Sequence, residues 1–335
     1  MGPRKQLASR SKHPRFPTHR ESGERRTKAR HDPTPAPQAR APPSPSPAAE
    51  RMAGRVIAGG RKVNFLYFDT HGFSLGQWIR AASCEDFCSM KERIYPILIQ
   101  EFYGSLGRGS DGWAATVRGI TFRVSDEILG SIWGIPCLGP TSDALTDREA
   151  GIRCILERDD IRGVTSVTAV QLSVEMRLLH HIVARIFLPK TGRFDYITER
   201  ELTVMVSLVR GLPLNIPGVM LRQMQEASTS KRLCLPYGMA LTRVFREFGV
   251  SFEDQIYREL QHADTYDDRS LHRMGYRLVS GRWTHRISGM EADSDSEEEQ
   301  IRAAEGATGH TVTEEGEPSM PPIARPPQPS PATLQ

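Results

Sequence analysis

The chain has 335 residues, with 44 Lys and Arg against 40 Asp and Glu and a formal net charge of +4. It contains no apolar run of about 18 residues, which excludes a membrane span formed by a single hydrophobic helix. Basic residues near the N-terminus, without an apolar stretch behind them, exclude a secretory signal peptide.

The charge is distributed unevenly along the chain. Residues 1–53 combine Arg and Lys with closely spaced Pro, and residues 290–335 combine an acidic run with Pro-rich sequence. Both segments offer too little apolar surface to offset the entropy of ordering, so we predict disordered tails of opposite charge. The folded part is expected within residues 54–289.

The five cysteines are scattered, which predicts reduced thiols in an intracellular protein. The cluster from Arg25 to Arg30 fits a nuclear localisation signal or a loose nucleic-acid contact, and a solvated basic tail is the alternative. We expect an intracellular protein, with the nucleus as the candidate compartment.

The first ordered elements are short. The apolar run at residues 63–68 is strand-like in composition, and residues 73–87 predict one or two short helices. Residues 94–103 predict a longer helix, with Pro96 in its first turn, where the missing N–H costs nothing.

A β-hairpin is expected next, because the apolar residues of 113–123 surround Arg118 and Gly119. Ser125 then begins a short helix that Gly134 stops. Thr146 and Glu149 have the spacing of a capping box, which predicts a helix reaching about residue 158.

Four helices follow in the centre of the chain. Apolar residues recur every three or four positions from 172 to 186, and Thr198 with Glu201 forms a second capping box. Gly211 ends that helix. The third helix is expected from Pro217 and the fourth from Pro236.

Beyond residue 252 the pattern weakens to one or two helical turns, and residues 276–283 are expected to form a closing strand. The predicted fold class is therefore mainly α, a helical core domain with a small contribution from a β-hairpin and short strands, between long disordered tails.

Short motifs keep their order along most of this folded part. They are Trp78–Ala82, Phe87–Cys88, Glu101–Leu106, Val117–Gly119, Trp133–Pro136, Phe187–Pro189, Gly211, Leu214–Ile216, Leu235–Gly238 and Phe248–Val250. With these motifs the chain resembles the putative plant transposon protein domain family over residues 65–274. The resemblance implies descent from a plant transposable element, and it supplies no catalytic residues to transfer.

Metal and cofactor sites find little support in the sequence. His180 and His181 are adjacent and point about 100° apart on a helix. Cys84 and Cys88 give at most half of a zinc site, so structural thiols and ordinary histidines are the preferred interpretation. We expect no metal and no cofactor.

Catalytic carboxylates and a nucleotide-binding loop also find little support in the sequence. The two-metal chemistry of a transposase needs converging acidic residues. Asp159, Asp160, Glu199, Glu201, Glu253 and Asp254 have no distinguishing context. The glycines from Gly104 to Gly109 lack the flanking strand and lysine of a phosphate loop, so a flexible loop is expected there.

Nucleic-acid binding is the open alternative to a plain solvated basic face. The candidate contacts are Arg25, Arg26, Lys28, Arg30, Arg222, Lys231, Arg232, Arg243 and Arg246. Ser294 and Ser296 each have Glu three residues downstream, which suits acidophilic kinases, and phosphate there would deepen the negative charge of the tail.

These observations favour a non-catalytic protein derived from a transposable element, whose helical domain contacts nucleic acid or other proteins. The alternative is a degenerate or accessory component of a transposition enzyme. The sequence indicates neither the partner nor the oligomeric state.

Overall fold

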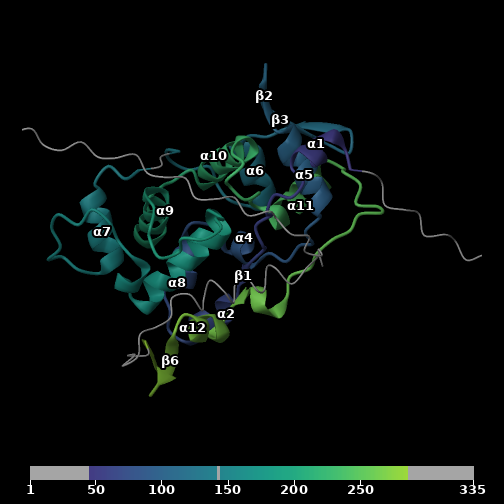
Figure 1. Ribbon diagram of the computed structural model, residues 1–335. Helices are drawn as coiled ribbons and strands as arrows, with labels where there is room; N and C mark the ends of the chain where they lie inside the picture. The colour runs from purple at the N-terminus through teal and green to yellow at the C-terminus, as the bar shows by residue number, and fades with distance from the viewer. Residues whose placement is uncertain (1–44, 142–143, 286–335) are drawn as a thin grey trace, which may run out of the picture. The chain divides into compact units, whose positions relative to one another are not determined.

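The computed structural model describes residues 45–141 and 144–285, and the fold of these residues is mainly α-helical with small sheets (Figure 1). The helices are α1 (Pro47–Arg51), α2 (Phe65–Thr70), α3 (Leu75–Ala81), α4 (Glu85–Ser89), α5 (Pro96–Ser105), α6 (Asp126–Trp133), α7 (Arg148–Leu156), α8 (Val174–Ile182), α9 (Glu199–Arg210), α10 (Ile216–Thr229), α11 (Gly238–Glu247) and α12 (Asp268–Arg273). Helical turns of other types are η1 (Ala169–Gln171), η2 (Val183–Phe187) and η3 (His262–Asp264). The strands are β1 (Lys62–Val63), β2 (Gly107–Gly109), β3 (Gly112–Val117), β4 (Ile120–Arg123), β5 (Thr265–Tyr266), β6 (Tyr276–Val279) and β7 (Arg282–His285).

Helix α1 lies inside the segment 1–53, for which the sequence predicts disorder. Ser46 caps this helix by accepting a hydrogen bond from the Ala49 N–H, and Ala49 is buried. The helix packs against α5, where Ala48 approaches Gly104. The predicted boundary is therefore wrong for residues 45–53, because α1 buries its apolar side on α5. The remaining predicted tail residues, 1–44 and 290–335, lie outside the described residues.

The apolar run at residues 63–68 forms a helix rather than the predicted strand. Only Lys62 and Val63 are extended, and they pair in parallel with β5. The side chain of Asn64 accepts a hydrogen bond from the Tyr67 N–H at 3.2 Å and so caps α2. Phe65 and Phe68 are buried on one side of that helix. This spacing of three residues is the helical signal that the run contains.

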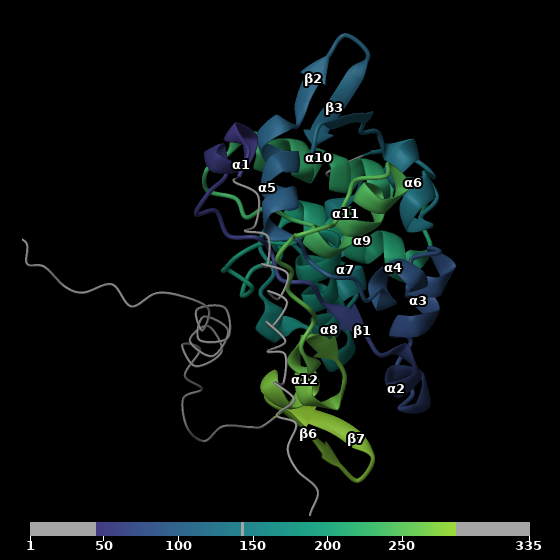
Figure 2. The same cartoon turned by 90° about the vertical axis from the view of Figure 1, so that its right-hand side faces the viewer.

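Helices α3, α4 and α5 occupy the predicted positions, and Pro96 lies in the first turn of α5 as expected. The prediction of a flexible loop at residues 104–109 is wrong. Gly104 belongs to α5, and Gly107–Gly109 is a strand that pairs antiparallel with β3. Together with β4, these strands extend the predicted hairpin into a three-stranded sheet, whose β2–β3 end projects beyond α5 and α10 in Figure 2.

Two predicted helix starts have different outcomes. Ser125 caps α6 by accepting from the Ile128 N–H, and Gly134 ends that helix with φ of 71°, both as predicted. The predicted capping box of Thr146 and Glu149 does not form. Asp147 caps α7 instead, accepting from the Ala150 N–H at 2.9 Å.

The central helices form the core of the described residues. Ser173 caps α8, which continues into the π-helical turn η2, and Thr198 with Glu201 forms the predicted capping box of α9. Helix α10 packs on α5 and α6, and α11 packs on the same two helices. Between α6 and α11, Trp133 is 1% exposed and donates from Nε1 to the Ala240 carbonyl at 3.1 Å.

The C-terminal part of the described chain contacts β1, near the start of that chain. Strand β5 pairs with β1, and α12 follows it. The single closing strand predicted at residues 276–283 is wrong, because the chain turns at Ser280 and Gly281 and forms the antiparallel hairpin of β6 and β7.

Candidate nucleic-acid interface

The structure separates the predicted basic contacts. Arg25, Arg26, Lys28 and Arg30 lie outside the described residues. Lys231 and Arg232 are exposed in the turn after α10. Arg222 donates to the Thr141 carbonyl at 3.3 Å. Arg243 and Arg246, both on α11, share a partner.

That partner is Glu92, in the segment before α5. Arg246 contacts both of its carboxylate oxygens, Nη2 to Oε2 at 2.8 Å and Nη1 to Oε1 at 3.1 Å. Arg243 Nε lies 3.4 Å from Oε1. The hydrogen bond from Arg246 is the main cause of the lowered pKa of Glu92. Two guanidinium groups on one carboxylate leave one positive charge in excess.

The two arginines also line a surface hollow of about 290 Å³ between α6 and α11. Its other lining residues are Ser131, Ile132 and Glu247. The hollow is therefore bordered by two guanidinium groups, a hydroxyl group and the carboxylate of Glu247. Guanidinium binds phosphate through paired hydrogen bonds, so the two arginines can accept a phosphate here against the opposing charge of Glu247.

Aromatic side chains adjoin these charges. The guanidinium carbon of Arg93 lies 4.1 Å from the ring centroid of Tyr257, and Arg93 Nε is 3.0 Å from Glu259 Oε1. Tyr95 lies against Phe252 at 4.6 Å and near Tyr257 at 5.9 Å between centroids.

We call this region the basic aromatic surface and define it by the following five residues. They are Arg93, Arg243, Arg246, Tyr257 and Arg258. Tyr95 is buried and packs near Tyr257. An antiparallel bridge between Ile94 and Arg258 holds its two segments together. Sequence reasoning missed Arg93, Tyr95, Tyr257 and Arg258. No local signal would have found them, because the contacts join segments more than 150 residues apart.

A larger hollow, of about 600 Å³, includes Lys91 of this segment in its lining. It is lined by Lys62, Asn64, Lys91, Leu260, Gln261, His262, Thr265, Asp267, Asp268 and Arg269. Lys91 lines this hollow, and the next residue, Glu92, pairs with the two arginines of the smaller hollow. Adjacent residues of one segment therefore contribute to both hollows.

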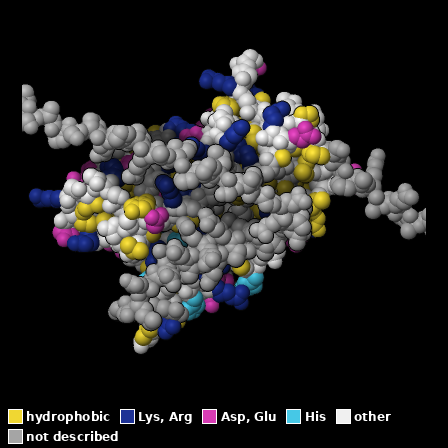
Figure 3. Space-filling model, in the orientation of Figure 1, with side chains coloured by type: hydrophobic (Ala, Val, Ile, Leu, Met, Phe, Trp, Pro, Cys, Tyr) yellow, Lys and Arg dark blue, Asp and Glu magenta, His cyan; other side chains and the backbone are white. Residues whose placement is uncertain are grey.

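The surface around Arg232 is different in character. A groove of about 460 Å³ runs past it at the C-terminal end of α10. Its other charged groups are paired, with Lys190 Nζ at 2.7 Å from Glu201 and Arg200 Nη2 at 2.8 Å from Glu226. Because these charges are paired, charge does not single out this groove. Figure 3 shows one face of the molecule, on which Lys and Arg are interspersed with Asp and Glu.

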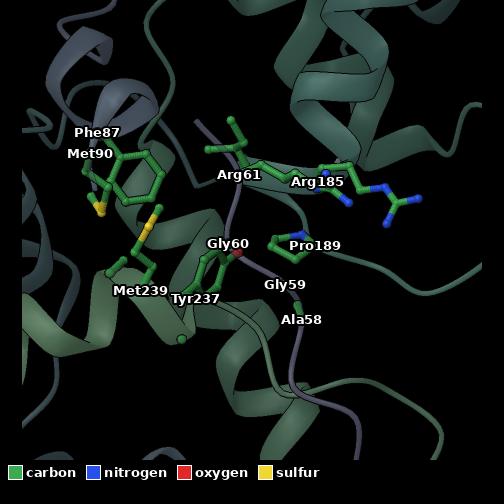
Figure 4. Close-up of a pocket in the computed structure, with 13 residues that line it drawn as sticks. Ala58, Gly59, Gly60, Arg61, Phe87, Met90, Arg185, Pro189, Tyr237 and Met239 are labelled. Carbon is green, nitrogen blue, oxygen red and sulfur yellow. The ribbon is translucent and has the colours of Figure 1, made fainter. Parts of the chain in front are cut away.

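A small apolar cavity lies where residues 58–61 cross α11 (Figure 4). Phe87, Met90 and Met239 converge on it, while the guanidinium group of Arg185 points away. Its volume of about 30 Å³ is enough for water and far below that of an ordinary ligand pocket.

Three of the six candidate catalytic carboxylates, Asp160, Glu199 and Glu201, take part in structural pairings. Asp160 pairs with Arg158, and Glu199 pairs with Arg148 at 2.6 Å. Glu201 closes the capping box of α9. Within residues 45–141 and 144–285, no three His, Cys, Asp or Glu side chains gather in an arrangement able to hold a metal ion.

The histidines and thiols considered as metal ligands are packed within the protein. Cys84 and Cys88 are buried, and burial raises the pKa of Cys84 to about 12. His180 is fully buried beside Glu201, and the ring of His181 stacks on Phe194.

The structure thus combines a mainly α-helical domain with a basic aromatic surface. None of the helices in its described part has the length and apolar character needed to cross a membrane. A family model described as a putative plant retrotransposon-related domain matches residues 80–251. The chain belongs to this family, which confirms the resemblance to plant transposon-derived proteins. No curated protein and no solved structure matches the chain.

Proposed function

We propose that this retrotransposon-related domain is a non-catalytic module that binds nucleic acid through its basic aromatic surface. The observation that carries the proposal is the sharing of Glu92 by Arg243 and Arg246 beside a surface hollow of about 290 Å³. The pairing of Asp160, Glu199 and Glu201 with basic or capping partners supports a non-catalytic role.

The mode of binding follows from the residue types. Guanidinium groups recognise phosphate oxygens, which are the same for every base, so binding should tolerate changes of sequence. Each phosphate neutralised by a basic side chain releases counterions, so affinity should fall steeply with salt. Glu92 and Glu259 offset part of the positive charge and make the affinity modest.

The test compares two double variants of the full-length chain. Arg243→Gln with Arg246→Gln should weaken binding of a fluorescent oligonucleotide about tenfold or more and lower the salt slope by about 2. Arg158→Gln with Arg162→Gln is the matched control, since it removes the same charge from exposed positions near α7. Thermal melts of both variants check that the fold is retained.

A third variant separates the tail from the core. Replacing Arg25, Arg26, Lys28 and Arg30 by Gln leaves the basic aromatic surface intact. If this change abolishes binding while the α11 double variant binds like the wild type, the surface is not the site. If neither change affects binding, or if the wild type binds nothing, the proposed function is wrong.

A further inference from the structure

Tyr257 is held in place while its ring remains accessible. Its side chain is 43% exposed, and the neighbouring Ile256 is 69% exposed. The Arg93 guanidinium lies over the ring, and Tyr95 packs near it at an interplanar angle of 57°.

The backbone around Tyr257 is also fixed. The Ile94 N–H donates to the Arg258 carbonyl at 2.9 Å, and the Arg258 N–H donates to the Ile94 carbonyl at 2.8 Å. The ring is therefore positioned before any ligand binds, which reduces the entropy cost of binding.

An exposed, fixed aromatic ring beside guanidinium groups suits an unpaired base. Bases stack on aromatic side chains irrespective of sequence, and arginine adds cation–π attraction. In a duplex the bases are stacked inside and their flat faces are not accessible, so only a single strand can use the ring.

The two hollows offer basic side chains for phosphates of the same strand. Arg243 and Arg246 line the smaller hollow, and Lys62 with Lys91 lines the larger one. Glu247 and Asp268 also line these hollows and lower the net attraction. Phosphate contacts alone would then give weak binding, and base stacking would contribute a large share of the affinity.

We infer that the basic aromatic surface takes single-stranded nucleic acid, with a base stacked on Tyr257 and phosphates in the two hollows. This inference rests on the proposed function and adds the class of ligand to it.

The experiment uses the full-length chain and three labelled oligonucleotides of equal length, which are single-stranded DNA, single-stranded RNA and duplex DNA. Tyr257→Leu keeps apolar contact with Arg93 but removes the aromatic face. It should weaken binding of single strands about fivefold or more and leave duplex binding unchanged. Tyr257→Phe should bind as the wild type does. Tyr196→Leu is the matched control, because Tyr196 is 53% exposed and lies outside the surface.

The comparison of DNA with RNA identifies which single strand is preferred, and preference for either one supports the inference. The inference is overturned if the wild type binds duplex as tightly as single strands, or if Tyr257→Leu behaves like Tyr196→Leu. If the α11 double variant still weakens all three ligands in that case, the proposed function stands and only the inference fails.

Discussion

The guanidinium group of Arg55 donates a hydrogen bond of 2.8 Å to the carbonyl of Ala227, in the last turn of α10. It also donates to the Ser230 carbonyl at 2.7 Å and to the Leu233 carbonyl. The last carbonyls of a helix lack partners within the helix, so Arg55 serves as the cap of α10 from a distant segment.

Replacing Arg55 by Met should lower the free energy of unfolding by about 2–3 kcal/mol, because charged hydrogen bonds to helix carbonyls are lost and the carbonyls stay partly buried. Urea denaturation followed by circular dichroism measures the change. Arg158→Met is the control, because its ion pair with Asp160 is exposed. Equal stability of both variants would contradict the capping role.

Acid sensitivity is predicted for Glu201. Burial opposes its ionisation, but His180 and Lys190 stabilise the carboxylate and hold its pKa at about 2, below the ordinary 4.5. A carboxylate with a lowered pKa stabilises the fold above pH 4.5, and this contribution is lost as the pH falls towards 2. The shift corresponds to about 3 kcal/mol.

The variant Glu201→Gln keeps the size of the side chain and removes its charge. Its stability should therefore fall less between pH 4.5 and pH 2 than that of the wild type, by about 3 kcal/mol. Lys190→Gln should flatten the same profile in part, since Lys190 Nζ lies 2.7 Å from Glu201. Identical acid profiles for the wild type and Glu201→Gln would refute this assignment.

Close packing of α1 on α5 predicts a severe effect at Gly104. A Cβ atom placed there would lie 2.0 Å from the Ala48 carbonyl oxygen, a backbone atom that can move only with α1. Gly104→Ala should cost about 1–3 kcal/mol, and trypsin should cleave faster at Arg51 and Arg55.

The control for this prediction is Gly107→Ala. The nearest atom to a Cβ at Gly107 is 3.7 Å away, which is an ordinary contact, and the strand is exposed. Its digestion rate should match that of the wild type. A similar digestion rate for the two variants would show that α1 does not depend on close contact with α5.

The sequence predicted those helices whose ends carry a local chemical signal. Thr198 and Glu201 lie three residues apart and close a capping box, and Gly211 adopts φ of 63° where α9 ends. Such signals involve neighbouring residues only, so they can be found without knowledge of the fold.

The misread segments show where local composition is ambiguous. The run at residues 65–68 consists of residue types found in strands, and the single three-residue spacing of Phe65 and Phe68 is too little to establish a helical period. Tertiary packing decided its structure, because a helix buries Phe65 and Phe68 together and leaves Leu66 75% exposed. The π-helical turn at residues 183–187 likewise has no signal in the sequence.

The candidate site could be predicted only in part. Arg243 and Arg246 are found by charge on a predicted helix, but their partner Glu92 lies more than 150 residues away in sequence. The same holds for Arg93 and Tyr257, whose contact depends on the long segment that follows α11. The sequence pattern is weak in that segment, so the position of Tyr257 beside Arg93 cannot be predicted from the sequence.

The parallel pairing of β1 with β5 has a consequence for synthesis of the protein. Val63 pairs with Tyr266, and Arg61 lies 3.0 Å from Asp264. At ordinary rates of translation, roughly 10–40 s separate the appearance of these partners, since 266 minus 63 is 203 residues. During that interval β1 has no strand to pair with. The nascent chain can complete this part of its fold only after residue 266 has been synthesised, and a ribosome that stops after residue 251 would release a chain in which β1 is unpaired.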